Sequence, residues 1–185
     1  MKLVVAALAG YLVGSVSPAA IVARLAGVDL RAVGSGNPGA TNVGRALGRR
    51  WGVLVALLDV LKGLVPAVLF GGTAGLVAGF AATLGHVTSP WLRGRGGKGV
   101  ATAGGAVLGS HPAWAAVVLG VWLVVAAASR WVALASVCAA LALPVCAVVA
   151  GDPREVTWSV AIAVLVVSRH RSNLRRWLAA RSSTD

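Results

Sequence analysis

Acidic side chains are scarce in this sequence, which has five aspartates and glutamates among 185 residues, against 17 lysines and arginines. With only three scattered histidines as well, the chain offers few metal ligands, so we expect neither a metal nor a cofactor. A His-x4-Asp pair is absent, because the fifth residues after the histidines are Trp91, Ala116 and Arg175. A Gly-x-Ser-x-Gly motif is absent too, which leaves a nucleophile-elbow hydrolase without support.

Cysteine is nearly absent from the chain. Cys138 and Cys146 lie in one apolar segment without a surrounding motif, and we expect buried small residues rather than a disulfide or a metal site. The net charge of +12 does not indicate nucleic-acid binding, because the cations form short clusters between apolar runs instead of one continuous basic face. Orientation in a membrane explains these clusters better.

What the chain has in abundance is apolar sequence. Hydrophobic residues make up 58% and charged residues 12%, with a mean hydropathy of +0.85, which is typical of a multi-span membrane protein. We expect one domain over residues 1–185. The first apolar run follows Lys2 as a signal peptide would, but its length suits a membrane span, and we expect it to stay in the mature protein.

The predicted fold is an all-α, polytopic membrane protein with seven transmembrane helices, some of them short. Gly71 and Gly72 are expected to form a tight turn between the second and third spans, and the GDPRE stretch another turn. Residues 99–128 are too many for one ordinary span, and Ser110-His111-Pro112 divides them into two short helices. The remaining spans are expected at residues 3–23, 51–70, 73–88, 131–150 and 156–168.

The charge distribution favours seven spans with the N-terminus outside and the C-terminus in the cytoplasm. In that topology the side opposite the cytoplasm receives only Lys2 and Arg154, as the enrichment of cations in cytoplasmic loops predicts. Joining the two short helices would destroy this bias. The cytoplasmic side receives fourteen cations: Arg24, Arg31, Arg45, Arg49, Arg50, Arg93, Arg95, Lys98, Arg130, Arg169, Arg171, Arg175, Arg176 and Arg181.

A glycine-rich basic stretch, GHVTSPWLRGRGGKGVAT at residues 85–102, interrupts the apolar sequence. It mixes glycines that expose backbone N–H groups with cations, and a helical pattern begins near Val100, so it predicts an anion site, most simply for phosphate. The alternative is a flexible connector with topogenic charge. It is not a Walker motif, because Gly99 follows Lys98 and no strand precedes the loop. The other cations and glycines are Arg93, Gly94, Arg95, Gly96 and Gly97.

Three further polar groups are candidates for chemistry. The run GSGNPGATNVGR offers hydroxyls, amides and an arginine fork between glycines, or else is an ordinary polar loop with a helix N-cap at Thr41 or Asn42. Asp59 and Lys62 share one helical face and should pair or meet a ligand in the bundle interior. The C-terminal group is a candidate site or a positive-inside anchor. It comprises His170 and Asn173, which share a face if the last helix continues, and Arg176.

The four segments GSGNPGATNVGR, LLDVLKG, GHVTSPWLRGRGGKGVAT and HRSNLRR, in this order, resemble the motif series of the bacterial acyl-phosphate:glycerol-3-phosphate acyltransferases, the PlsY family. The resemblance spans nearly the whole chain. It implies a seven-helix inner-membrane enzyme that transfers an acyl group from acyl phosphate to glycerol 3-phosphate and forms lysophosphatidate. Two departures are Arg93-Gly94-Arg95, where the family often has Lys-Phe-Lys, and Ser172, where an acidic residue is common.

The resemblance and the residue chemistry together predict one cytoplasmic site for two phosphorylated substrates beside membrane lipid. We expect the catalytic group to be Ser35, Arg45, Lys98, His170 and Asn173. We expect substrate or phosphate contacts from Asn37, Thr41, Asn42, Asp59, Lys62, His86, Arg93, Arg95, Gly96, Gly97, Gly99 and Thr102. Two other hypotheses are a small organic-phosphate transporter that uses Asp59 and Lys62 as a midplane ion pair, and a lipid-binding scaffold. The oligomeric state is not predicted.

Overall fold

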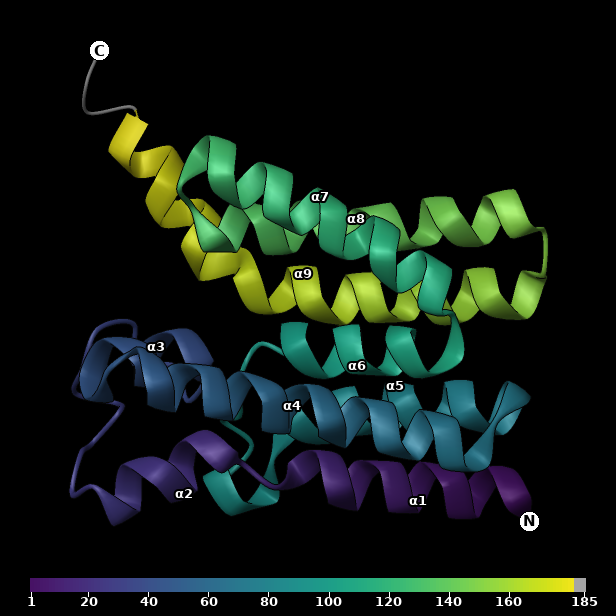
Figure 1. Cartoon of the computed structure of the whole chain (residues 1–185), viewed down its shortest axis with the longest axis horizontal. Coiled ribbons are helices and arrows are strands. Elements are labelled where there is room, and N and C mark those ends of the chain that lie inside the picture. The colour runs from purple at the N-terminus through teal and green to yellow at the C-terminus, as the bar shows by residue number, and fades with distance from the viewer. Residues whose placement is uncertain (182–185) are drawn as a thin grey trace. The chain divides into compact units, whose positions relative to one another are not determined.

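The computed structural model describes residues 1–181, with side chains described through Arg175, and its secondary structure over this range is helical (Figure 1). The chain divides into two compact units, Met1–Pro112 and Ala113–Asp185, and each is treated by itself. Arg176 and Arg181 lie outside the described side chains.

The first unit contains six α-helices and one 3₁₀ turn, and the second contains three long helices. In the first unit the elements are α1 (Lys2–Ser15), α2 (Pro18–Leu25), α3 (Ala40–Leu47), α4 (Arg49–Phe70), α5 (Gly72–Thr88), η1 (Pro90–Leu92) and α6 (Val100–Ser110). The helices of the second unit are α7 (Pro112–Ser129), α8 (Val132–Ala150) and α9 (Pro153–Arg181).

Four segments of the described chain are long and apolar enough to cross a membrane: Lys2–Leu25, which combines α1 and α2, together with α4, α7 and α8. The helix α6 is apolar but shorter. This confirms an all-helical chain with membrane spans, while the predicted total of seven spans and their orientation stay predictions.

The first expected span is confirmed as the apolar segment Lys2–Leu25, but it is interrupted within the span, which the sequence did not lead us to predict. α1 ends at Ser15, Val16 is extended with ψ of 131°, and α2 begins at Pro18. The cause is local, because a proline disfavours helical geometry in the preceding residue and has no N–H to donate. The Ser17 side chain accepts a hydrogen bond from Ala20 N at 3.2 Å and so caps the new helix.

Most other boundaries agree with the sequence. Gly71 and Gly72 have φ of +60° and +49° and make the expected turn between α4 and α5, and the chain breaks at His111 as predicted. The last helix was predicted too short. α9 continues through the basic tail to Arg181, because no glycine or proline follows Pro153 within it. Only Gly151 and Asp152 of the predicted GDPRE turn lie outside a helix.

Glycine and alanine set the packing of the first unit. A Cβ on Gly10 or Gly14 of α1 would overlap the backbone of Ala78 or Ala82 in α5, and a Cβ on Gly63 of α4 would overlap the backbone of α6. Helices that approach this closely use the small-residue packing typical of membrane bundles. The close approach brings the C-terminal end of α5 against α1 and α4, where the candidate site begins.

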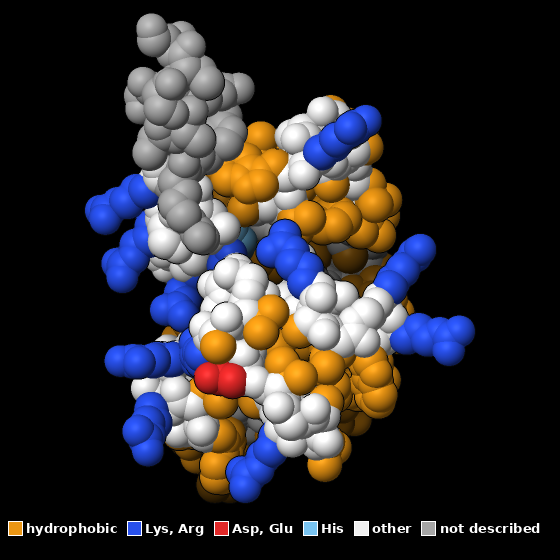
Figure 2. Space-filling view, turned by 90° about the vertical axis from the view of Figure 1, so that its left-hand side faces the viewer, with side chains coloured by type: hydrophobic (Ala, Val, Ile, Leu, Met, Phe, Trp, Pro, Cys, Tyr) orange, Lys and Arg blue, Asp and Glu red, His pale blue; other side chains and the backbone are white. Residues whose placement is uncertain are grey.

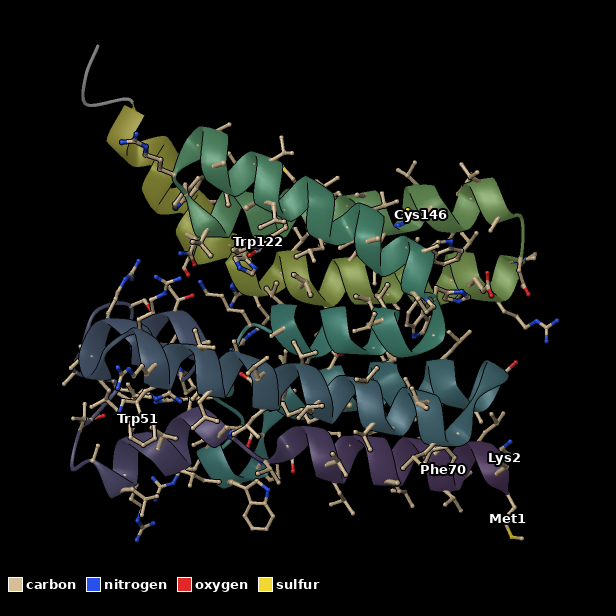
Figure 3. The ribbon with its side chains drawn as sticks, viewed as in Figure 1. Met1, Lys2, Trp51, Phe70, Trp122 and Cys146 are labelled. Carbon is tan, nitrogen blue, oxygen red and sulfur yellow. The ribbon has the colours of Figure 1, made fainter. Side chains whose placement is uncertain are left out.

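Large apolar side chains project outward from these helices, as Figure 3 shows around α1 and α4. Leu8 and Leu12 are 60% and 59% exposed, as expected for side chains that face lipid. In the second unit, Trp122 of α7 donates a hydrogen bond from Nε1 to Ser136 Oγ of α8 at 3.2 Å, and both cysteines are free and partly buried.

Exposed cations gather at the end of the first unit that carries α2, α3 and the polar loops (Figure 2). Asp29 is the single exposed acidic residue among residues 1–112, so this end is strongly electropositive. The exposed cations of this end are Arg24, Arg31, Arg45, Arg49, Arg50, Arg93 and Arg95.

Candidate functional site

The glycine-rich loop is seated directly on the end of α5. Gly96 N donates to Val87 O at 3.0 Å, and Gly97 N donates to His86 O at 3.1 Å. A Cβ on Gly96 would overlap the backbone carbonyl of His86, and a Cβ on Gly97 would overlap the His86 imidazole. Only glycine therefore fits at either position while the loop keeps this contact with the end of α5.

The turn that precedes this loop is hydrogen-bonded to the end of α1, where the first span is interrupted. Ser89, which is buried, donates from Oγ to Ser15 O at 2.6 Å, and Trp91 donates from Nε1 to Ser15 Oγ at 2.9 Å. Gly94 N donates to Ser89 O at 2.9 Å and closes the turn. The loop is thus held on both sides of its two arginines, and Arg93 takes the left-handed backbone conformation with φ of +53°.

The loop ends at the N-terminus of α6, which begins at Val100 as the sequence predicts. Gly99 occupies the N-cap with φ of +83°, a conformation that favours glycine. The first N–H groups of a helix have no partner within it and carry partial positive charge, so this terminus is suited to an anion. One turn further, Thr102 is fully buried and its hydroxyl has no hydrogen-bond partner.

The other polar loop is organised by Asn42 of α3, which is 1% exposed. Its Nδ2 donates to Leu30 O and Val33 O, both at 3.0 Å, and its Oδ1 accepts from Ser35 N at 3.1 Å. α3 begins at Ala40 with Gly39 at the N-cap, so the alternative prediction of a cap at Thr41 or Asn42 was wrong. Instead, the Asn42 amide holds the backbone that presents Ser35.

Around this loop the remaining predicted residues are accessible. Ser35, Thr41 and Arg45 are exposed, and Asn37 is partly buried. The Arg45 side chain lies along the loop, since a Cβ on Gly34 would be 3.8 Å from its Cδ. The loop therefore offers hydroxyls, an amide and a guanidinium within one short segment.

Arg31 connects the two loops and was missed as a site residue in the sequence. Its guanidinium donates from Nη1 to Gly36 O at 3.3 Å and from Nη2 to Arg95 O. In the sequence, Arg31 could be recognised only as one of fourteen predicted cytoplasmic cations, because its contact with Arg95 depends on tertiary structure. Arg31 therefore links the first loop and the glycine-rich loop within the first unit.

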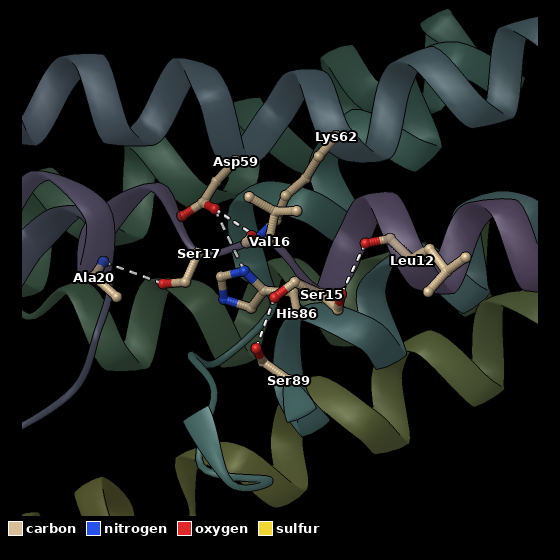
Figure 4. Close-up of polar contacts among 9 residues, drawn as sticks. All are labelled: Leu12, Ser15, Val16, Ser17, Ala20, Asp59, Lys62, His86 and Ser89. Carbon is tan, nitrogen blue, oxygen red and sulfur yellow. Dashed lines mark hydrogen bonds and ion pairs between the residues drawn. The ribbon is translucent and has the colours of Figure 1, made fainter. Parts of the chain in front are cut away.

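Below the loops, a buried ionic cluster joins α4, α5 and the break between α1 and α2 (Figure 4). Asp59 Oδ1 lies 2.9 Å from Lys62 Nζ and 3.4 Å from His86 Nδ1, and Lys62 Nζ donates to Val16 O at 2.8 Å. The three ionisable side chains are each no more than 7% exposed. The prediction that Asp59 and Lys62 pair and face the interior is confirmed.

The C-terminal candidates lie on α9 in the second unit. His170 is 2% exposed and its Nδ1 lies 2.8 Å from Val166 O one turn earlier. Asn173 is partly buried and follows on the same face at the i+3 position, because the helix continues past the last apolar residues. Arg176 belongs to the undescribed side chains.

These features define a helical membrane protein with an electropositive, glycine-rich site suited to phosphorylated ligands. No cluster of three or more metal-ligating side chains occurs in the part of the chain that the structure describes. A family model described as glycerol-3-phosphate acyltransferase matches residues 4–180. The chain belongs to that family.

Curated relatives agree over almost the full chain. It is 42% identical to the glycerol-3-phosphate acyltransferase of Aquifex aeolicus, covering 98% of each chain, and 44% identical to that of Geobacter sulfurreducens, covering 90% and 89%. Two crystal structures of the integral membrane glycerol 3-phosphate acyltransferase PlsY share the fold. The glycerol 3-phosphate form has a TM-score of 0.93 at 39% identity, and the lysophosphatidic acid form 0.90 at 38%, each covering 98% of this chain and 94% of the other.

Proposed function

We propose that this protein transfers an acyl group from acyl phosphate to the 1-hydroxyl of glycerol 3-phosphate, forming 1-acyl-glycerol 3-phosphate and inorganic phosphate. Its family and its relatives' shared name support the acceptor and the reaction class. The two PlsY crystal forms are described by glycerol 3-phosphate and by lysophosphatidic acid, which are the acceptor and the product of this reaction.

The chemistry requires little more than binding and orientation. The acceptor hydroxyl oxygen attacks the acyl carbonyl carbon, the bond from that carbon to the phosphate oxygen breaks, and phosphate leaves with the electron pair. Acyl phosphate is a mixed anhydride with a good leaving group, so the departing phosphate can accept the hydroxyl proton without a strong protein base. Holding two anions in register is then the main contribution of the enzyme.

The proposed residues have two kinds of role, phosphate binding and orientation of the acceptor hydroxyl. Arg45, Lys98 and the backbone N–H groups at the start of α6 bind phosphate groups, while Ser35 orients the acceptor hydroxyl. His170 and Asn173 of the second unit are also proposed as catalytic residues. Supporting phosphate contacts are proposed for Asn37, Thr41, Arg93, Arg95, Gly99 and Thr102.

The observation that carries the proposal is the glycine-rich loop itself, which is hydrogen-bonded to His86 at Gly97 and carries cations before and after its paired glycines. The test is conversion of acyl phosphate and glycerol 3-phosphate to lysophosphatidate by the purified protein in detergent or liposomes. Lys98→Ala and Arg45→Ala should each lower kcat/KM by about a hundredfold, as expected for loss of a charge-assisted contact to a reacting phosphate. Normal turnover in both variants would refute these assignments.

We further propose a multi-pass protein of the bacterial inner membrane, with seven spans, an outer N-terminus and a cytoplasmic active site. The electropositive end of the first unit supports this orientation. In a variant without native cysteines, a membrane-impermeant maleimide applied outside cells should label Arg154→Cys and should not label Arg24→Cys. Labelling with the opposite pattern would reverse the proposed orientation.

A further inference from the structure

His86 stands between a buried carboxylate and the glycine-rich loop. Its Nδ1 faces Asp59 Oδ1 at 3.4 Å, and its Nε2 edge is packed against Gly97 so closely that a Cβ there would overlap the ring. We propose that Asp59 is a positioning residue that acts through His86 on Gly97 and Lys98, and so sets the geometry of the phosphate site at the start of α6. This inference rests on the proposed function.

The coupling from His86 to the loop has two independent parts. The imidazole edge fills the space beside Gly97, and the backbone carbonyl of the same residue accepts the Gly97 N–H at 3.1 Å. A rotation of the ring would therefore change the surface against which Gly97 packs. Lys98 is the next residue, and two residues further the first turn of α6 begins.

The coupling from Asp59 to His86 is orientational. A carboxylate beside one ring nitrogen favours a proton on that nitrogen and one orientation of the imidazole, a role that carboxylates perform for functional histidines in many proteins. Here the two atoms lie 3.4 Å apart, in electrostatic contact but without the geometry of a hydrogen bond. Asp59 is 3% exposed and no other carboxylate is buried in the first unit, so no neighbouring acid can replace it.

Lys62 has a separate role in the same cluster. Its ammonium neutralises Asp59 and also donates to Val16 O, the carbonyl that the break between α1 and α2 leaves without a helical partner. An ion pair within an apolar bundle is costly to bury, and apolar side chains of similar volume commonly replace such pairs without loss of stability. Packing alone therefore does not account for the pair, whereas orientation of His86 requires the carboxylate.

Two variants can separate the role of Asp59 from that of Lys62. Lys62→Met removes the ammonium but leaves Asp59 facing His86, while the double variant Asp59→Asn/Lys62→Met removes both charges and leaves no unpaired buried ion. Both are to be purified and compared with the wild type by thermal unfolding, so that kinetics are measured on folded protein. Wild-type conversion is measured first, because an inactive wild type contradicts the proposed function and not this inference.

We expect the double variant to raise KM for the phosphate substrate held by the loop about tenfold, with kcat within about threefold, since a displaced binding loop weakens binding more than chemistry. Lys62→Met, which keeps the Asp59 carboxylate beside His86, should raise this KM clearly less than the double variant does. An increased KM in Lys62→Met equal to that of the double variant overturns the inference in favour of direct ligand contact by Lys62. Unchanged KM in the double variant overturns it in favour of a purely structural pair.

A spectroscopic measurement distinguishes positioning from general loosening. The chain has three histidines, so the ring nitrogens of 15N-histidine-labelled protein can be assigned with a His86→Gln variant. We expect the wild type and Lys62→Met to show one His86 tautomer with the proton on Nδ1, and the double variant to lose that preference. The same His86 signals in all three proteins would refute the role of Asp59.

Discussion

The guanidinium of Arg31 donates a hydrogen bond to the backbone carbonyl of Arg95, a residue 64 positions later in the chain. A second hydrogen bond from the same guanidinium reaches Gly36 O. Arg31 thereby joins the loop that presents Ser35 to the loop that carries Lys98. The two candidate binding segments are held at a fixed separation by one side chain whose rigid fork reaches both carbonyls.

Arg31→Ala removes both hydrogen bonds and should lower kcat/KM by about tenfold, which corresponds to about 1.4 kcal/mol. Arg31→Lys should recover little of this, because a single ammonium lacks the planar fork that reaches two carbonyls. The measurement is steady-state acyl transfer. Arg24→Ala is the matched control, an exposed arginine at the end of α2, and it should behave as wild type. Equal losses in Arg24→Ala and Arg31→Ala would show that only overall charge matters.

The glycine-rich loop predicts a graded series of alanine substitutions. Gly96→Ala should be the most harmful, with activity reduced by roughly a hundredfold or more, because its Cβ would force backbone away from the His86 carbonyl. Gly97→Ala should be less harmful, since the His86 ring can give way in part. Gly104→Ala is the control within α6, with nothing within 4 Å of the added Cβ, and should raise stability by about 0.5–1 kcal/mol. Activity assays and thermal unfolding check the order, which a flexible connector would not produce.

Asn42 is expected to matter for stability as well as for activity. Asn42→Ala removes three hydrogen bonds to the backbone between Leu30 and Ser35, at least one of them buried, and should destabilise the first unit by about 2–4 kcal/mol. Thermal unfolding in detergent measures this change. Thr41→Ala, at an exposed neighbouring position, should leave the unfolding midpoint unchanged. Equal midpoints for the two variants would contradict the structural role of the amide.

Close packing between α1 and α5 gives a prediction that does not involve the site residues. Gly14→Ala would place a methyl group on the backbone of Ala82 and should destabilise the protein by about 1–3 kcal/mol through overpacking. Gly120→Ala adds the same methyl group in α7, where nothing lies within 4 Å, and should be neutral or stabilising. A lowered midpoint for Gly120→Ala alone would show that the glycine packing has been misassigned.

Most helices could be predicted from the sequence because their ends are marked by local chemistry. Gly71-Gly72, His111-Pro112 and Gly99 all end or begin helices where expected. Two of the differences from the predicted helices also have local causes. Apolar composition concealed the break before Pro18, and charge in the tail was mistaken for the end of α9, although nothing in that tail breaks a helix.

The site was harder to predict where a residue acts through tertiary contacts. The pairing of Asp59 with Lys62 followed from their spacing and from the cost of isolated charge in lipid. Two contacts could not be predicted from the sequence: the hydrogen bond from Arg31 to Arg95 and the packing of Gly97 against His86. Each depends on how distant segments pack. Asn42 was recognised as important, but its amide serves the protein backbone.

The interruption of the first helix has a consequence for engineering this enzyme. The two carbonyls at the interruption, those of Ser15 and Val16, accept hydrogen bonds from Ser89 and Lys62. Replacing Ser17-Pro18 by alanines would favour an unbroken helix and satisfy these carbonyls internally. The repaired helix would then compete with both partners, so a gain in thermal resistance here should be accompanied by slower acyl transfer.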